Sequence, residues 1–482
     1  MKLTLDYSQN VRTVSSLIGV GRSFDCIERH LSVGGEDVTF FYIDGFVKDA
    51  ELQRIMQQVT SSERISSADE LVRKLAYVEV GTMEDGDEIA AAVLSGQTAL
   101  MAGAFPGLAI LIDARTYPAR GTAEPDSDRV MQGPRDGFVE TLVMNTALVR
   151  RRIRDPRLTV EHFQVGSVSR TDVAVVYMEG VADPRLVGNI KARLGRIRTS
   201  SLTLGYQSLA ECLIRRGWLN PFPKIRTTER PDAAAAQIME GSVIVICDTS
   251  PQAMILPTSI FDYLQQTDDY YFPPLTGTYL RIVRTAILLL SLFVTPIWYL
   301  ALENAELLPP ALSFLVPDEP GALPIMLQLL LVELAIDGLK IASMNTPDML
   351  SNSLSVIGAL ILGDFAVSVG WVSEDVVLYM AFVALANFAQ QNAELGYAIK
   401  FVRVLTLILV WALGVWGLVA GVLLFLFLVA TNKTATEGVG YLYPLIPFNG
   451  AALCRLIFRI KKDDVREIEG ENNQKRGKGK MR

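Results

Sequence analysis

Histidine and cysteine are scarce in this chain of 482 residues, and both are scattered. The two histidines, His30 and His162, lie far apart in the sequence, and the four cysteines form no CxxC pair. Structural zinc sites draw on clustered Cys and His side chains, so we expect neither a metal nor another cofactor. Basic residues number 45 against 52 acidic ones, giving a net charge of −7. Because phosphate binding needs a basic face, this balance argues against a nucleic-acid partner.

Enzyme signatures are missing as well. The segment GVGRS at 19–23 matches neither phosphate-binding pattern, GxxxxGK[ST] or GxGxxG. No GxSxG nucleophile motif occurs in the sequence, and we therefore expect the chain not to be an enzyme. The first ten residues, MKLTLDYSQN, lack the apolar core of a secretion signal. This predicts a cytosolic N-terminal head, where thiols stay reduced.

Charge is distributed very unevenly along the chain. Of all its charged residues, only 18 lie between Thr285 and Ile460. Hydrocarbon about 30 Å thick is crossed by about 20 apolar helical residues, and this region predicts six such spans. The last span is interrupted by Pro444 and Pro447 and is short or re-entrant. The predicted spans are 285–302, 323–342, 354–372, 376–393, 404–431 and 439–457.

The charges between the spans predict their orientation. The link after the first span has four acidic residues and no basic one, whereas Lys400 and Arg403 follow the fourth span. The tail from Arg455 contains ten basic residues. Basic loops stay on the cytosolic side, which predicts six passes with the head and the tail inside. Lys433, predicted to lie outside, does not fit this topology.

The first 280 residues alternate between short apolar runs and helical spacing. CIERHLSVGGEDVTFFYIDGF predicts a β-hairpin around Gly34 and Gly35, and KDAELQRIMQQV predicts a helix capped by Asp49. The basic cluster at 150–157 is interpreted as a solvated helix end with salt bridges, the alternative being contact with phosphate or headgroups. Strand–helix alternation favours two small α/β subdomains.

The expected fold class is therefore an α/β cytosolic head of two small subdomains, followed by an all-α multipass membrane domain. The expected boundaries are 1–120 and 121–280 for the subdomains, 281–460 for the membrane domain and 461–482 for a charged tail.

Charged side chains inside the predicted spans are the candidate functional residues, because charge at bilayer depth costs several kcal/mol unless it is paired or faces water. Glu333, Asp337 and Lys340 project from one helical face. This stripe faces protein or a water path, or belongs to a helix lying flat in the headgroups. Asp364 follows small residues such as Gly358, which allow close helix packing.

Repeated around an oligomer axis, Asp364 would form a ring of carboxylates that favours cations. The alternative is a carboxyl group hydrogen-bonded between helices. We expect the acids at bilayer depth to be tolerated because several copies encircle a wet axis. A further set of small residues in the fifth span predicts helix packing only: Gly414, Gly417 and Gly421.

Long blocks of the chain resemble the A subunits of GerA-type spore germinant receptors. They are QGPRDGFVETLVMNTALVRRRIRDPRL and TTERPDAAAAQIMEGSVIVICDTSPQAMILP. GRSFDCIERHLSVGGEDVTFFYIDGFVKD and GYQSLAECLI are more similar to the SpoVAF branch. The resemblance implies a multipass protein of the spore inner membrane that forms a pentameric ring around an ion path. It also implies another small membrane protein and germinant receptor complexes as partners.

Together these observations predict a homo-oligomeric channel subunit that passes monovalent cations and amplifies germination. Asp364 would supply charge at one pore end, with Leu362 and Ile361 as candidates for an apolar constriction. Glu333 and Asp337 would line a vestibule or pair with Lys340. The rival hypothesis is a non-conducting scaffold that organises receptors or a partner channel.

Overall fold

The chain divides into two compact units. The computed structural model describes residues 1–116, 130–214, 219–345, 366–390, 392–432 and 440–459. Of these residues, the head unit comprises 1–116, 130–214 and 224–258, and the helical unit comprises 219–223, 259–345, 366–390, 392–432 and 440–459. The expected border at residue 280 therefore lies inside the helical unit. Tyr263, before that border, packs in one apolar cluster with Leu288 and Leu395.

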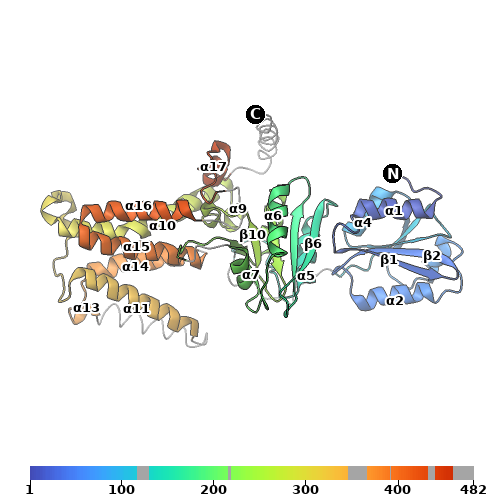
Figure 1. Cartoon of the computed structure of the whole chain (residues 1–482), viewed down its shortest axis with the longest axis horizontal. Coiled ribbons are helices and arrows are strands. Elements are labelled where there is room, and N and C mark those ends of the chain that lie inside the picture. The colour runs from blue at the N-terminus through green and yellow to red at the C-terminus, as the bar shows by residue number, and fades with distance from the viewer. Residues whose placement is uncertain (117–129, 215–218, 346–365, 391, 433–439, 460–482) are drawn as a thin grey trace. The chain divides into compact units, whose positions relative to one another are not determined.

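The first subdomain of the head unit is a five-stranded sheet covered on both faces. Its sheet order is β1-β2-β4-β5-β3. Helices α1 and α4 cover one face and α2 the other (Figure 1). The hairpin around Gly34 and Gly35 is confirmed, whereas Asp49 is the first residue of its helix and Lys48 occupies the cap position. The elements are α1 (Tyr7–Ile18), β1 (Cys26–Val33), β2 (Glu36–Ile43), α2 (Asp49–Thr60), α3 (Ala68–Lys74), β3 (Val80–Met83), α4 (Gly86–Leu94), β4 (Thr98–Ala102) and β5 (Ala109–Ile112).

The second subdomain repeats this plan. Its sheet order, β6-β7-β9-β10-β8, is the same order five strands later. The predicted border near residue 120 falls within 117–129, outside the described residues. The elements are α5 (Leu142–Arg152), β6 (Leu158–Val165), β7 (Thr171–Met178), α6 (Pro184–Leu194), α7 (Tyr206–Leu213), β8 (Arg226–Thr228), α8 (Pro231–Met239), β9 (Val243–Cys247) and β10 (Ala253–Leu256).

The repeat extends to register and to single residues. EDVTFFYIDG at 36–45 corresponds to TDVAVVYMEG at 171–180. Val38 pairs with Ala102 in the first sheet, as Val173 pairs with Cys247 in the second. The turn before the third sheet position carries a glycine at φ +99° in both halves, Gly96 and Gly241. The head unit is therefore one supersecondary plan used twice.

The expectation of two subdomains is confirmed, but their sheets are antiparallel throughout. A parallel α/β sheet needs a crossover between each strand and the next. Here β1–β2 and β4–β5 follow each other closely, and only β2 to β3 and β3 to β4 are joined through helices. The alternation of strands and helices in the sequence does not distinguish these two arrangements.

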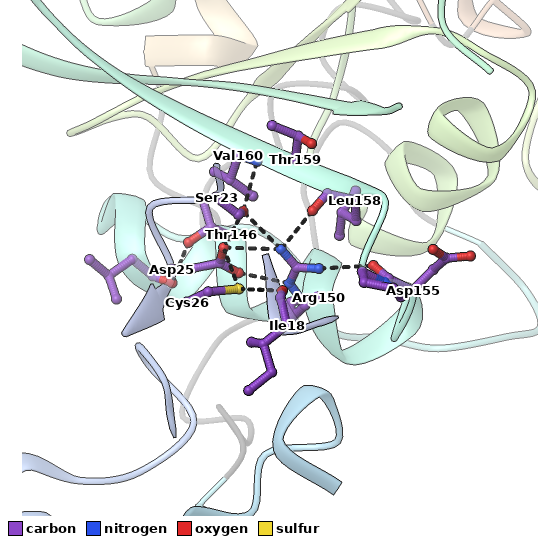
Figure 2. A network of polar contacts seen from close by, with 12 residues as sticks. Ile18, Ser23, Asp25, Cys26, Thr146, Arg150, Asp155, Leu158, Thr159 and Val160 are labelled. Atoms are coloured by element: carbon purple, nitrogen blue, oxygen red, sulfur yellow. Dashed lines mark hydrogen bonds and ion pairs between the residues drawn. The ribbon is translucent and has the colours of Figure 1, made fainter. Parts of the chain in front are cut away.

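A buried ion pair joins the two subdomains (Figure 2). Arg150 of α5 donates from Nε and Nη2 to the Asp25 carboxylate at 2.7 and 3.0 Å, and both side chains are fully buried. Ser23 donates to Asp25 and accepts from Arg150 and from the Val160 amide. The interpretation of Arg150 as part of a solvated helix end was therefore wrong. The guanidinium satisfies a carboxylate contributed by the other subdomain.

The helical unit contains long apolar helices that lie side by side (Figure 1). Two of them, α10 and α15, are long and apolar enough to cross a membrane, and α16 is a shorter apolar helix. The elements are η1 (Ile260–Tyr263), α9 (Asp268–Tyr271), α10 (Pro274–Glu303), η2 (Ala305–Leu307), η3 (Pro310–Leu315), α11 (Ile325–Asn345), α13 (Ala366–Ser368), α14 (Glu374–Phe388), α15 (Ala393–Leu413), α16 (Val415–Thr431) and α17 (Gly450–Ile457).

Three predicted spans differ from the structure. The stretch 376–393 is not one helix, because α14 ends at Phe388 and α15 begins at Ala393. The stretch 404–431 is not one helix, because Gly414 at φ +56° ends α15 and begins α16. In the described part of 439–457, the helix is α17, whose eight residues are about 12 Å long. This is less than half the thickness of a hydrocarbon layer. Most of the predicted span 354–372 lies outside the described residues.

Candidate functional site in the helical unit

Opposite charges on α11 and α15 meet inside the helical unit. Glu333 and Asp337 are one turn apart on α11, and Lys400 and Arg403 are three residues apart on α15. These spacings place each pair on one helical face. Because the two faces meet, two carboxylates are neutralised by two cations within the same chain.

The Glu333–Arg403 pair is the more buried of the contacts. Arg403 Nη2 donates to both Glu333 carboxylate oxygens at 2.8 and 2.7 Å, and Nη1 donates to the Ser291 carbonyl of α10 at 3.3 Å. The exposed fractions of the two side chains are 11% and 2%. Arg403 therefore connects three helices.

Lys400 joins the two acidic residues. Its Nζ lies 3.2 Å from Glu333 Oε1 and contacts the Asp337 carboxylate. The Asp337 side chain is 32% exposed, so it is the member of the cluster most open to its surroundings. Lys340 takes no part in these ion pairs, and its Nζ lies 4.5 Å from the ring centre of Tyr397.

A small cavity lies beside the cluster. Its volume is about 30 Å³, enough for about one water molecule. Charged and amide side chains line one part of it, among them Glu333, Asp337, Lys400 and Asn387, and apolar side chains such as Phe388 line the rest. A site of this kind can hold a water or a small ion next to charged groups, although the carboxylates already have cationic partners in the same chain.

The structure changes the interpretation of the acidic residues on α11. Their stripe faces α15, and their partners are Lys400 and Arg403 rather than Lys340. The expectation that a wet oligomer axis makes these acids tolerable is not needed for Glu333 or Asp337, because the chain supplies its own counter-charges. The remaining pore candidates, Asp364, Leu362, Ile361 and Gly358, lie outside the described residues.

The three glycines of the fifth predicted span have different surroundings. A Cβ on Gly417 would overlap the Leu409 backbone, and one on Gly421 would overlap the Thr406 side chain. Both glycines therefore let α16 approach α15 closely. Gly414 has open space around it and a positive φ, so it serves the turn between the helices.

Sequence reasoning missed Lys400 and Arg403 as site residues. They were interpreted as the basic loop after the fourth span, but both are buried within α15. A signal for their role is present in the sequence. An i, i+3 pair of cations in an otherwise apolar helix complements the i, i+4 pair of acids on α11.

Comparison with known proteins agrees with the resemblance seen in the sequence. A family model for the Bacillus/Clostridium GerA spore germination protein matches residues 14–467. Stage V sporulation protein AF of Bacillus subtilis (strain 168) is 37% identical over 94% of this chain and 92% of its own length. Spore germination protein KA of the same organism is 28% identical over 92% of this chain and 82% of its own.

Among solved structures, the chain is similar to the N-terminal domain of the A subunit of the Bacillus megaterium spore germinant receptor GerK3. The match has 24% identity and a TM-score of 0.40, and covers 53% of this chain and 96% of that one. The family match over nearly the whole chain and the 37% identity to a sporulation protein confirm the expected resemblance, including that to the SpoVAF branch. This chain therefore belongs to the GerA family of spore germination proteins.

Proposed function

We propose that this protein is a homo-oligomeric channel subunit of the spore germination apparatus, which passes monovalent cations and amplifies the germination response. In this proposal it resides in the spore inner membrane as a multipass protein with its head in the cytosol. The head unit assembles the ring and receives an opening signal, the membrane helices conduct, and the protein carries out no catalysis. Germinant receptor complexes and another small membrane protein are its partners, and the ring is a pentamer.

Six passes remain compatible with the helices of the helical unit. In this topology α15 and α16 provide the last two crossings, replacing the single span predicted at 404–431. Because α15 and α16 form a hairpin, the chain returns after α16 to the side from which α15 began. The sequence after Asn432 then lies on the cytosolic side, which removes the conflict of Lys433 with the positive-inside rule.

The observation that carries the proposal is the balanced charge cluster between α11 and α15. Glu333, Asp337, Lys400 and Arg403 lie within apolar helices, two of the four inside a candidate membrane span. Ionisable groups at bilayer depth are costly, and their presence points to a functional rather than an anchoring helix bundle. In the proposed channel, α11 moves relative to α15. This movement breaks the ion pairs between the two helices and lets water and ions contact the charged side chains.

Recording from the purified full chain in planar bilayers, together with its partners, tests the proposal. We expect a current carried by monovalent cations, with reduced conductance or altered selectivity in the variant Asp364→Asn. Current that is absent from a correctly assembled oligomer contradicts it.

One observation favours a non-conducting scaffold as the second candidate. The acids on α11 are neutralised inside the protomer, so they also suit a closed bundle without an ion path. Absence of current combined with retained binding to receptor complexes would support this alternative.

A further inference from the structure

The chain beyond α16 returns to the start of α10. The Ile260 amide donates to the Tyr441 carbonyl at 2.9 Å. At the far end of α17, the Arg459 amide donates to Thr278 Oγ1 at 3.0 Å, and Arg281 Nη1 donates to the Leu456 carbonyl at 3.3 Å. The segment 441–459 is thus attached to the part of α10 that precedes its charge-free stretch.

This attachment fixes the depth of the segment relative to α10. The charge-free stretch of α10 begins at Thr285. Thr278 and Arg281 precede it by seven and four residues, which correspond to about 10 and 6 Å along a helix. If α10 crosses a bilayer as proposed above, Arg281 lies in the headgroup layer, which is about 5–8 Å thick on each side of the hydrocarbon, and Thr278 lies just outside that layer.

The segment exposes apolar side chains at this level. Phe448, Ile446 and Phe458 are 75%, 64% and 53% exposed. Apolar residues that are contiguous and exposed usually mark an interaction surface. A short helix with such neighbours is suited to lie in the plane of a membrane interface. Tyr270 and Tyr279 are exposed next to it, and tyrosine is enriched at that depth.

The positive groups at this level are engaged within the chain. Arg281 and Arg284 bind the fully buried Asp269. Arg459 donates from Nη2 to the Tyr270 carbonyl, and its Nη1 is buried. The surface that the described segment exposes is therefore mainly apolar.

We propose that residues 441–459 do not cross the membrane but lie in its cytosolic interface, where the exposed apolar side chains insert at the boundary between lipid headgroups and acyl chains. This inference rests on the membrane crossing of α10 in the proposed function, and not on ion conduction. It assigns a lipid-binding surface to a segment for which the sequence predicted a sixth span.

Quenching of a fluorophore in the full-length protein tests the depth. Cys454 is exposed on α17 and can be labelled with a polarity-sensitive dye in the variant Cys212→Ser. The protein is reconstituted in vesicles of phosphatidylcholine, alone or mixed equally with phosphatidylglycerol. Nitroxide lipids carry the quencher either near the headgroup or at the end of the acyl chain. We expect quenching at Cys454 by the shallow quencher only, in both vesicle compositions.

A deep control distinguishes the two hypotheses. Ile297→Cys, with Cys212 and Cys454 replaced by Ser, places the dye near the bilayer centre, about 18 Å along α10 from Thr285. Deep quenching at both positions shows that the last segment crosses and overturns the inference. Deep quenching at 297 with no quenching at Cys454 also overturns the inference. Disulfide cross-linking between two chains through Cys454 would then show that a second copy covers the apolar surface of residues 441–459. No quenching at 297 refutes the membrane crossing itself.

Discussion

Among the described side chains of the charge cluster, Arg403 links the largest number of helices. It donates to both oxygens of Glu333 on α11 and to the backbone of Ser291 on α10 while belonging to α15 itself. Its planar guanidinium binds the carboxylate through Nη2 and the Ser291 carbonyl through Nη1, two separate nitrogens that a lysine side chain does not have. Loss of this one side chain should therefore loosen three helices together.

Arg403→Met is expected to destabilise the protein by about 3–5 kcal/mol, because it leaves the buried Glu333 carboxylate with Lys400 as its remaining partner. Asp337→Asn should cost far less, since Asp337 is one-third exposed. Thermal unfolding in detergent measures both. The double variant Arg403→Met, Glu333→Leu should recover much of the loss, and equal effects of the two single variants would contradict the assignment.

The cysteines provide a second prediction at this scale. Burial, with the nearby Asp25 charge adding to it, raises the pKa of the Cys26 thiol to about 12, and burial likewise raises the pKa of Cys247 to about 12. Because the thiolate is the reactive form, native protein at pH 8 should be alkylated at Cys212 and Cys454 only, as mass spectrometry can show. Above the ordinary pKa of 9.0, the unfolded state gains by ionising these thiols, so stability should fall. Rapid native labelling of Cys26 would contradict its burial.

Residue types alone identified Glu333 and Asp337 as candidate functional residues, but they did not predict the basic residues with which these acids pair. Glu333 and Asp337 were identified because charge is rare in apolar helices. Lys400 and Arg403 were assigned to a loop, since the helix that contains them starts at Ala393, inside the stretch interpreted as the fourth span. Pairing between helices depends on their packing, which a single sequence does not contain.

At the scale of elements, the turn between α15 and α16 could not be predicted from composition. The stretch 404–431 is free of charge, and hydropathy cannot locate a reversal inside a uniformly apolar run. Gly414 was the available signal, but its positive φ is a property of the backbone. The hairpin strands of the head, by contrast, were predictable because a Gly-Gly pair divides two runs of alternating residues.

Gly421→Ala is expected to separate α16 from α15, because the new methyl group would overlap Thr406, and Gly417→Ala should do the same at Leu409. Gly338→Ala is the matched control. Gly338 lies within α11 with open space around it, so alanine there should be neutral or stabilising by up to about 1 kcal/mol. Unfolding temperatures in detergent compare the three. A neutral Gly421→Ala would refute the close approach of the helices.

At the scale of the whole molecule, helix α5 connects the two subdomains of the head unit, because it packs in the cores of both. Leu148 and Val149 of α5 pack in the second subdomain, while Ala147 packs in the first. The Asp25–Arg150 pair fixes the same helix. The sequence indicated two subdomains, but neither their antiparallel sheets nor their shared helix. The sheets depend on strand pairs as far apart as Val173 and Cys247, and the shared helix depends on contacts such as that between Asp25 and Arg150, which lie 125 positions apart.

Asp25→Asn should weaken this junction by about 3–5 kcal/mol, because Arg150 would stay buried without a counter-charge. The double variant Asp25→Leu, Arg150→Met should be closer to wild type. Arg157→Gln, at an exposed pair with Asp155, is the control and should have little effect. Limited proteolysis of the full chain reports on the junction, and equal protection of Asp25→Asn and wild type would disprove its importance.

Because the two subdomains of the head unit have the same fold, a substitution in one can be compared with the same substitution at the equivalent position of the other. Gly45 and Gly180 are equivalent and share nearly the same backbone, with φ of +79° and +80°. A methyl group at Gly45 would press on Ala147 and Val143 at 3.0 and 3.1 Å, whereas at Gly180 nothing lies within 4 Å. Alanine would impose similar torsional strain at both, so subtracting one unfolding free energy from the other isolates the steric fit of α5 alone.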